Sequence, residues 1–532
     1  MEWASKSSRP NLMKLERTKN AKRNMLFGAI NKVITLLLPF IVRTAVIYQL
    51  GSEYLGLNSL FTSILQVLSL SELGFSQAVV YSMYKPIADG DEDTICALLS
   101  FYRLAYKVIG LVILVLGLCV LPFLPYLIEG SYPADVNIYV VYVVYLVNTS
   151  LSYLLFAYKS ALLTAHQRVD VTSNVLTITT SAMNLCQIAV LFLFANYYAY
   201  VVLIPLFTLA NNVINLVVVN RMYPQYRCRG KVGPKLMGDI KRKVAGLMIQ
   251  KICATSRNSL DSVFVSAFIG LTATAIYANY YYVLLSVTNL LAVISASILA
   301  GAGNSVAMES REKNYADMNK FNFLYMWISG WCTCCMLCLY QPFMQVWVGA
   351  DLMLPMSSVV LFCLYFYVLK MGDIRSVYVE STGIWWENKF RAIAEAVLNI
   401  VLNFALVQVF GINGIIAATL ISLFLINFCY GSQLIFKYYF QNGKLGEYFR
   451  YHGWYLLVTV AACVASFVVC ELIPFGGIAG LAVKLFICCI VPNIVYLICY
   501  CRTKQYGISM KWILHSFNLD KKLSFLLPKT AR

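Results

Sequence analysis

Nine ionisable side chains lie inside long apolar stretches of the sequence, where charged groups are rare. Six are cations and three are anions: Lys32, Arg43, Lys251, Arg257, Lys370, Arg375, Glu72, Asp261 and Asp373. A charge is costly in hydrocarbon, so such a residue usually faces a protein-lined or watery cavity and has a function. The surplus of positive charge predicts a site for an anion. Arginine suits phosphate or diphosphate in particular, because it can donate two parallel hydrogen bonds.

Simpler explanations exist for several of these charges. Arg257 and Asp261 are four residues apart, and Lys370 and Asp373 are three apart, so each pair could neutralise itself on one helix face. Their assignment to a binding site or to a local ion pair stays open at this stage.

Snorkelling is a second alternative. Lys32 and Lys251 lie close enough to the cytoplasmic edge for their ammonium groups to reach water. Arg391 and Glu395 fall near an inner helix end, where snorkelling or pairing four residues apart is the favoured explanation.

Arg43 is the strongest single candidate for an anion site. It lies well inside its apolar stretch and has no acidic residue at helical spacing. Lys32 lies eleven residues earlier, on the same face of a helix. Glu72 is interpreted as the counter-ion of Arg43 or as a proton-coupling group.

The composition identifies the setting of these charges. Of 532 residues, 60% are hydrophobic and only 12% are charged. That charge content is about half of what a soluble surface carries, and it also excludes intrinsic disorder. The sequence therefore predicts an all-α polytopic membrane protein. The net charge of +18 is explained below by its placement, and no nucleic-acid partner is expected.

Apolar segments near the length that crosses a bilayer predict about fourteen transmembrane helices. They lie at 25–49, 56–82, 101–125, 138–163, 171–195, 199–220, 246–269, 275–301, 321–345, 356–380, 390–410, 414–437, 453–471 and 478–500. Every second connection, beginning after the first helix, contains no Lys or Arg, whereas the other connections hold nearly all the loop cations. This segregation predicts that both termini lie in the cytoplasm, in a multi-pass protein of the plasma (inner) membrane.

The longest basic connection divides the first six helices from the next six. The chain is weakly repetitive around this divide: Leu50-Gly51 ends the first helix as Ile269-Gly270 ends the seventh. We predict two six-helix lobes in parallel repeat around a central cavity, with two trailing helices. The predicted parts are a basic cytoplasmic segment (1–24), an N-terminal lobe (25–220), a basic inter-lobe loop (221–245), a C-terminal lobe (246–437), trailing helices (438–501) and a basic amphipathic tail (502–532).

The remaining chemistry-bearing residues argue against an enzyme. The spacing of Cys332, Cys334, Cys335 and Cys338 is like that of a metal site, but these residues lie in an apolar run where packing is the favoured explanation. We therefore predict no metal and no cofactor. The three histidines are assigned to connections or the tail, and no nucleotide-binding loop is present. Any transport energy would come from an ion gradient or the membrane potential.

Several stretches resemble bacterial polysaccharide repeat-unit flippases, the O-antigen and teichoic-acid type translocases of the multidrug/oligosaccharidyl-lipid/polysaccharide exporter superfamily. The resemblance covers about residues 24–500 and is carried by 43–57, 71–78, 258–261 with Gly270 and Tyr277, 342–349, Glu395-Ala396, Asn399, Asn403 and 411–415.

The resemblance implies transport of an undecaprenyl-pyrophosphate-linked oligosaccharide from the inner to the outer leaflet by alternating access. It implies that Arg43 and Arg257 hold the diphosphate. It leaves the roles of Asp261 and Glu72 in ion coupling open. Expected partners are the lipid-linked oligosaccharide, membrane lipids, and a polysaccharide polymerase or glycosyltransferases. Alternatives are a multidrug exporter of the same fold, which a net positive cavity disfavours, and a membrane glycosyltransferase or polymerase, which short outer loops disfavour.

Overall fold

The structure is a computed structural model that describes residues 37–69, 75–166, 168–234, 236–238, 240, 255, 259–474 and 476–516. Most of these residues are helical, with no strand among them. Within the described ranges, ten helices are long and apolar enough to cross a membrane, and one bent pair of helices would make an eleventh. The predicted all-α polytopic membrane fold is thus confirmed. The count of fourteen stays a prediction, because the predicted first, second and seventh spans lie partly outside the described residues.

The helices group into two compact units, which alternate along the chain. The first unit contains a helix at Leu37–Gln49, α3 (Phe75–Asp89), α4 (Glu92–Val120), α5 (Ile138–Leu154), the 3-10 turn η3 (Ala157–Lys159), α6 (Ser160–Ala165), α7 (Val169–Phe194) and α8 (Tyr197–Met222). The second contains α2 (Ser52–Leu68), most of the 3-10 turn η2 (Leu121–Leu127), a helix at Ser259–Phe268, α10 (Leu271–Met308), α11 (Arg311–Val348), η4 (Ala350–Leu352), α12 (Met356–Met371), α13 (Asp373–Thr382), α14 (Trp385–Phe410), α15 (Ile412–Ser422), the π-helix η5 (Leu423–Tyr430), α16 (Gly431–Ile435), the π-helix η6 (Phe436–Phe440), α17 (Leu445–Glu471), α18 (Gly477–Tyr500) and α19 (Lys504–Ser516).

Local sequence signals explain where helices of the first unit begin and pack. Asp91 caps α4, since its carboxylate accepts hydrogen bonds from the Thr94 backbone N–H at 2.9 Å and from the Thr94 hydroxyl. These bonds favour the ionised carboxylate and lower the pKa of Asp91. Gly117 brings α4 against α5, because a Cβ there would lie 2.2 Å from a methyl carbon of Leu146.

The two proposed copies of the repeat contain the same kind of backbone turn, at Gly51 in one and at Gly270 in the other. Gly51 has φ of +121° and Gly270 has φ of +116°, a conformation that favours glycine. The N–H of Gly51 donates to the carbonyl of Val46 at 3.1 Å, and the N–H of Gly270 donates to the carbonyl of Val265 at the same distance. Each glycine therefore separates two consecutive helices in the same way.

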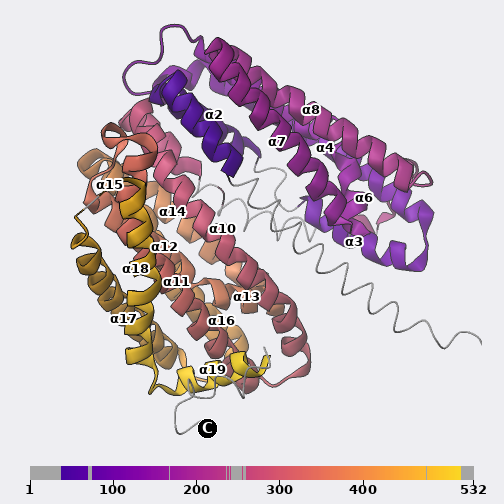
Figure 1. Ribbon diagram of the computed structural model, residues 1–532. Coiled ribbons are helices and arrows are strands. Elements are labelled where there is room, and N and C mark those ends of the chain that lie inside the picture. Colours follow the sequence, from indigo (N-terminus) through magenta and orange to yellow (C-terminus); the bar gives the residue numbers. More distant parts are fainter. Residues whose placement is uncertain are drawn as a thin grey trace, which may run out of the picture. The chain divides into compact units, whose positions relative to one another are not determined.

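The C-terminal part of the second unit is a helical bundle closed by an amphipathic helix. Helices α11, α17 and α18 lie side by side, and α19 lies across the end of the bundle (Figure 1). Trp512 of α19 meets Phe321 of α11 edge to face, with ring centroids 5.3 Å apart. Ser509 donates a hydrogen bond to the Lys320 carbonyl at 3.3 Å. The predicted amphipathic tail thus begins as a helix docked on α11.

We expect Gly56→Val to destabilise the second unit. A Cβ at Gly56 in α2 would lie 2.2 Å from the backbone carbonyl oxygen of Leu271, so the two helices must separate, at a cost of about 1–3 kcal/mol. Thermal unfolding in detergent, followed by tryptophan fluorescence, should show a lower melting temperature. Gly453→Ala in α17 is the control, since no atom lies within 4 Å of its added Cβ. An equal melting temperature for Gly56→Val and the native chain would contradict the close contact.

Candidate functional site

A short break between α12 and α13 brings together two of the predicted site residues. Lys370 lies in the last turn of α12, Gly372 interrupts the helix, and Asp373 begins α13. The Lys370 ammonium lies 2.9 Å from a carboxylate oxygen of Asp373, and the hydroxyl of Tyr325 in α11 donates to the same oxygen. The local ion pair that the spacing allowed is therefore present.

This pair borders a cavity of about 410 Å³ within the second unit. The lining comes from α10, α12 and α13 and includes Tyr281, Thr288, Ser295, Lys370, Asp373 and Glu380. The charged groups on this lining are one ammonium and two carboxylates, so the cavity by itself has no cationic surplus. The tyrosine and hydroxyl groups beside it could hydrogen-bond to a polar ligand.

Arg375 lies in a different place from the cavity. It is only 2% exposed, and its guanidinium donates to the backbone carbonyl of Asn427, to the Asn427 side-chain oxygen at 3.0 Å and to Ser376 Oγ at 3.1 Å. Gly431 makes room for it, because a Cβ at this position would lie 1.8 Å from the guanidinium. Arg375, which the sequence predicts to bind the diphosphate, is thus held by hydrogen bonds to other groups of the protein.

The network continues to a buried ion pair. A guanidinium nitrogen of Arg391 lies 2.5 Å from a carboxylate oxygen of Glu395, and both residues are on α14. Asn427 donates to the same oxygen at 2.9 Å, and Arg391 also donates to Asn388 at 2.7 Å. The pairing expected from the spacing of four residues is confirmed. The alternative prediction, that Arg391 and Glu395 extend to the membrane surface, is wrong, because both side chains are buried.

The π-helix η5 explains why Asn427 can join these residues. A π-helix pairs each N–H with the carbonyl five residues earlier, and such wide turns are frequent at functional sites. Asn427 lies inside η5 and offers both its backbone carbonyl and its side-chain amide. The sequence signal for it is weak, since Asn427 is one of two amide side chains, with Gln433, in the apolar run at 414–437.

Asp261 forms the centre of a second polar cluster, on the helix Ser259–Phe268. Its carboxylate is 1% exposed and accepts hydrogen bonds from Asn403 at 2.8 Å, from Tyr277 at 3.0 Å and from Thr419 at 3.0 Å. Asn399 donates to Thr419 at 2.9 Å. The side-chain oxygen of Asn403 is buried with no hydrogen-bond partner among the described atoms. The cluster thus gathers one carboxylate, two hydroxyls and two amides, the oxygen-rich set that hard cations prefer.

Arg43 lies on the helix Leu37–Gln49 of the first unit, where it is half-buried. Lys32, Glu72, Lys251 and Arg257 lie outside the described residues. Five of the nine predicted residues are therefore described. Within the second unit the structure brings together Lys370 and Asp373, and it places Asp261 and Arg375 in two different hydrogen-bond networks.

His452 corrects one expectation from the sequence. It was assigned to a connection because the apolar segment begins at residue 453, but α17 already begins at Leu445. The imidazole is buried inside the bundle, with Nε2 2.9 Å from the amide nitrogen of Asn322. The helix begins two turns before its apolar segment, and one face of those turns, with Tyr448 and His452, is buried against the bundle.

Removal of Arg391 should be among the most damaging changes in the second unit. Arg391→Met takes the cation away from the buried Glu395 and should cost about 3–5 kcal/mol of unfolding free energy. The double variant Arg391→Met/Glu395→Leu should recover much of that loss. Denaturant unfolding in micelles measures both.

The matched control is an exposed ion pair at the same spacing. Lys313 and Glu309 lie 2.8 Å apart with side chains 56% and 43% exposed, so Lys313→Met should cost about 0.5 kcal/mol or less. Equal losses for Arg391→Met and Lys313→Met would show that burial of the first pair has no energetic consequence.

The same fold occurs in solved structures of membrane transporters. Lipid II flippase MurJ, in an inward closed conformation, aligns with a TM-score of 0.66 and 14% identity, over 89% of this chain and 99% of its own. An inward-facing multidrug resistance MATE family transporter of the MOP superfamily aligns with a TM-score of 0.58 and 12% identity, over 76% of this chain and 94% of its own. A MOP superfamily transporter from Pyrococcus furiosus with a binding pocket of reversed polarity aligns with a TM-score of 0.51 and 12% identity, over 76% and 94%.

No protein-family model and no curated protein matches the sequence. The likeness in three dimensions therefore reaches much further than the likeness in sequence. It extends over most of the chain and over nearly all of each of these transporters. This chain is a multi-pass membrane protein with the fold of the MOP-superfamily transporters.

Proposed function

We propose that this protein is a flippase that moves an undecaprenyl-pyrophosphate-linked oligosaccharide from the inner to the outer leaflet of the plasma membrane by alternating access. The observation that carries the proposal is the alignment with a lipid II flippase, which covers 89% of this chain, against 76% for the multidrug transporter. The stretches that resemble repeat-unit flippases support the same substrate class. In this proposal both termini face the cytoplasm, and glycosyltransferases or a polymerase work beside the protein.

A multidrug exporter is the second candidate, because proteins described as MATE transporters share the fold. The two candidates differ in the charge of the cargo headgroup. A lipid diphosphate needs cations, whereas a cationic drug needs carboxylates. The cavity beside Lys370 and Asp373 is lined by one ammonium and two carboxylates, so the cations that a diphosphate needs have to come from residues outside that lining.

Arg43 is the residue that we assign to the diphosphate. It is half-buried on an apolar helix. A charged side chain in such a helix is costly, and for this reason it usually has a functional role. Its planar group can donate two hydrogen bonds to one phosphate, which a lysine ammonium cannot match in geometry. Arg257, Lys32 and Lys251 are assigned to the same headgroup on the grounds of the resemblance and of their charge.

Replacing Arg43 tests the flippase. Arg43→Ala should abolish export while protein abundance stays near normal, and Arg43→Lys should keep part of it, because the charge remains and the paired hydrogen bonds are lost. Complementation of a flippase-deficient strain measures export, and immunoblotting of membranes measures abundance. Full export by Arg43→Ala would remove Arg43 from the substrate site.

Asp261 is the residue that we assign to energy coupling. Its carboxylate, the hydroxyls of Tyr277 and Thr419 and the amide of Asn403 converge in a buried position. These are ligands for a small hard cation such as Na⁺, and the buried Asn403 oxygen adds a further acceptor. A bound cation would bring together the helix of Asp261, α10, α14 and α15, and so could bias the lobe toward one conformation.

Asp261→Asn should remove the dependence of export on the Na⁺ gradient. Its neutral amide keeps the size of the side chain and loses the charge that attracts the cation. Export measured in proteoliposomes with and without a Na⁺ gradient checks this. The control is Ser286→Ala on α10, because the Ser286 hydroxyl donates only to the Tyr282 carbonyl of its own helix, at 2.8 Å. Export by the native protein that follows pH and ignores Na⁺ would identify the proton as the coupling ion instead.

A further inference from the structure

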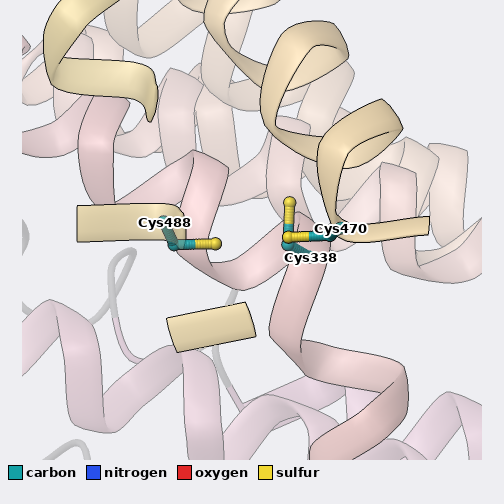
Figure 2. Close-up of side chains that lie close together, drawn as sticks. All are labelled: Cys338, Cys470 and Cys488. Atoms are coloured by element: carbon teal, nitrogen blue, oxygen red, sulfur yellow. The ribbon is translucent and has the colours of Figure 1, made fainter. Parts of the chain in front are cut away.

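Three cysteines from three different helices meet in the interior of the C-terminal bundle. Cys338 of α11, Cys470 of α17 and Cys488 of α18 are at most 4% exposed. Their sulfur atoms all lie within 4.8 Å of one another. In Figure 2 the Cys488 sulfur points toward the other two side chains. Among the described residues, this is the one group of three ligand-type side chains close enough to hold an ion.

We propose that these three thiols, referred to below as the thiol triad, form a binding site for Cu(I). Soft thiolate ligands select Cu(I) and Zn²⁺ over hard cations. Three sulfurs around one ion, with metal–sulfur bonds of about 2.3 Å, must lie about 4 Å apart, which small side-chain rotations in the triad would achieve. Binding replaces thiol protons by the metal, and each proton leaves to water.

The surroundings favour Cu(I) over Zn²⁺. Structural zinc sites are almost always four-coordinate, whereas Cu(I) is satisfied by two or three sulfur ligands. Partly buried hydrophobic side chains, among them Leu339, Phe467 and Ile487, pack against the triad. A fourth sulfur lies beside them, since the thiol of Cys335, one helical turn before Cys338, is hydrogen-bonded to Cys488. A zinc site would have to recruit Cys335 as its fourth ligand, whereas Cu(I) needs only the triad.

Lys484 supplies charge next to the triad. It lies one turn before Cys488 on α18. Its side chain is largely buried, and its ammonium lies 3.9 Å from a carboxylate oxygen of Glu471, whose own side chain is mostly exposed to solvent. The Cys470 thiol is also 4.0 Å from the Lys484 backbone carbonyl. A thiolate–Cu(I) complex carries negative charge, and a neighbouring ammonium offsets it in a low-dielectric interior.

The sequence pattern pointed to a different grouping. Four cysteines between 332 and 338 share one helix, so their spacing alone suggested packing. Only Cys338 of that group joins the triad, because its two partners come from helices more than 130 residues further along the chain. A metal here would tie α11, α17 and α18 together, and it would stabilise the folded bundle by binding it and not the unfolded chain.

The test uses the full chain, purified in detergent under reducing conditions, loaded with Cu(I) and competed with bicinchoninate. We expect one copper per chain to be retained, with an X-ray absorption spectrum showing sulfur neighbours only. Cys338→Ser/Cys470→Ser/Cys488→Ser should lower the affinity by about 100-fold or more, since even outer-shell changes cost 10–100-fold. Size-exclusion elution and transport activity verify that this variant folds.

Two controls make the result specific. Cys334 and Cys463 form a separate buried pair, with sulfurs 3.3 Å apart, and Cys334→Ser/Cys463→Ser should retain copper. So should a variant with serine at the exposed Cys119, Cys186 and Cys489. The proposal fails if copper follows the Cys334 and Cys463 pair, if the triple variant binds like the native chain, or if Zn²⁺ is retained in preference to Cu(I). Should the triple variant misfold, Cys488→Ser alone must still weaken retention.

Discussion

A charge buried in an apolar helix bundle needs oxygen or nitrogen partners, since the bilayer core supplies no water to solvate it. The second unit meets this requirement with hydrogen bonds between helices far apart in sequence. Arg375 of α13 reaches Asn427 in η5, and Asn427 in turn reaches Glu395 of α14. Asp261 is held by residues of α10, α14 and α15. These contacts set the register of the helices more sharply than apolar packing can, because a shift of one residue would leave polar groups in hydrocarbon.

The two clusters differ in how strongly they resist change. The pair of Arg391 and Glu395 balances opposite charges, so it is suited to hold α14 in one position. The Asp261 cluster instead surrounds a single carboxylate with hydroxyl and amide donors. Both clusters reach α14, one through Arg391 and Glu395 and the other through Asn403.

Much of the architecture could be predicted from the sequence because the bilayer leaves so few solutions. Apolar length and loop charge are local properties, and they indicated the helices and the membrane class directly. Pairs at helical spacing, such as Lys370 with Asp373, were also accessible. Cross-helix partners were not: nothing near Arg375 in sequence indicates Asn427, and nothing near Cys338 indicates Cys488. The predicted start of α17, at residue 453, was eight residues too late, because the preceding residues include charged and polar side chains. One face of these turns is buried against other helices, and hydropathy along the sequence gives no information about that burial.

The π-helical turn at η5 has a consequence for how this lobe tolerates insertion and deletion. A π-turn holds one residue more than the α-turn it replaces. Loss of one residue between Leu423 and Tyr430 would therefore turn the wide turn into a regular α-turn and leave the residues after it on their present faces. Gly431 would still lie against the Arg375 guanidinium. The loss would fall instead on Asn427, whose backbone carbonyl and side chain reach Arg375 from inside the wide turn. A deletion here would thus leave the path of the helix unchanged and remove the bridge between α13 and α14.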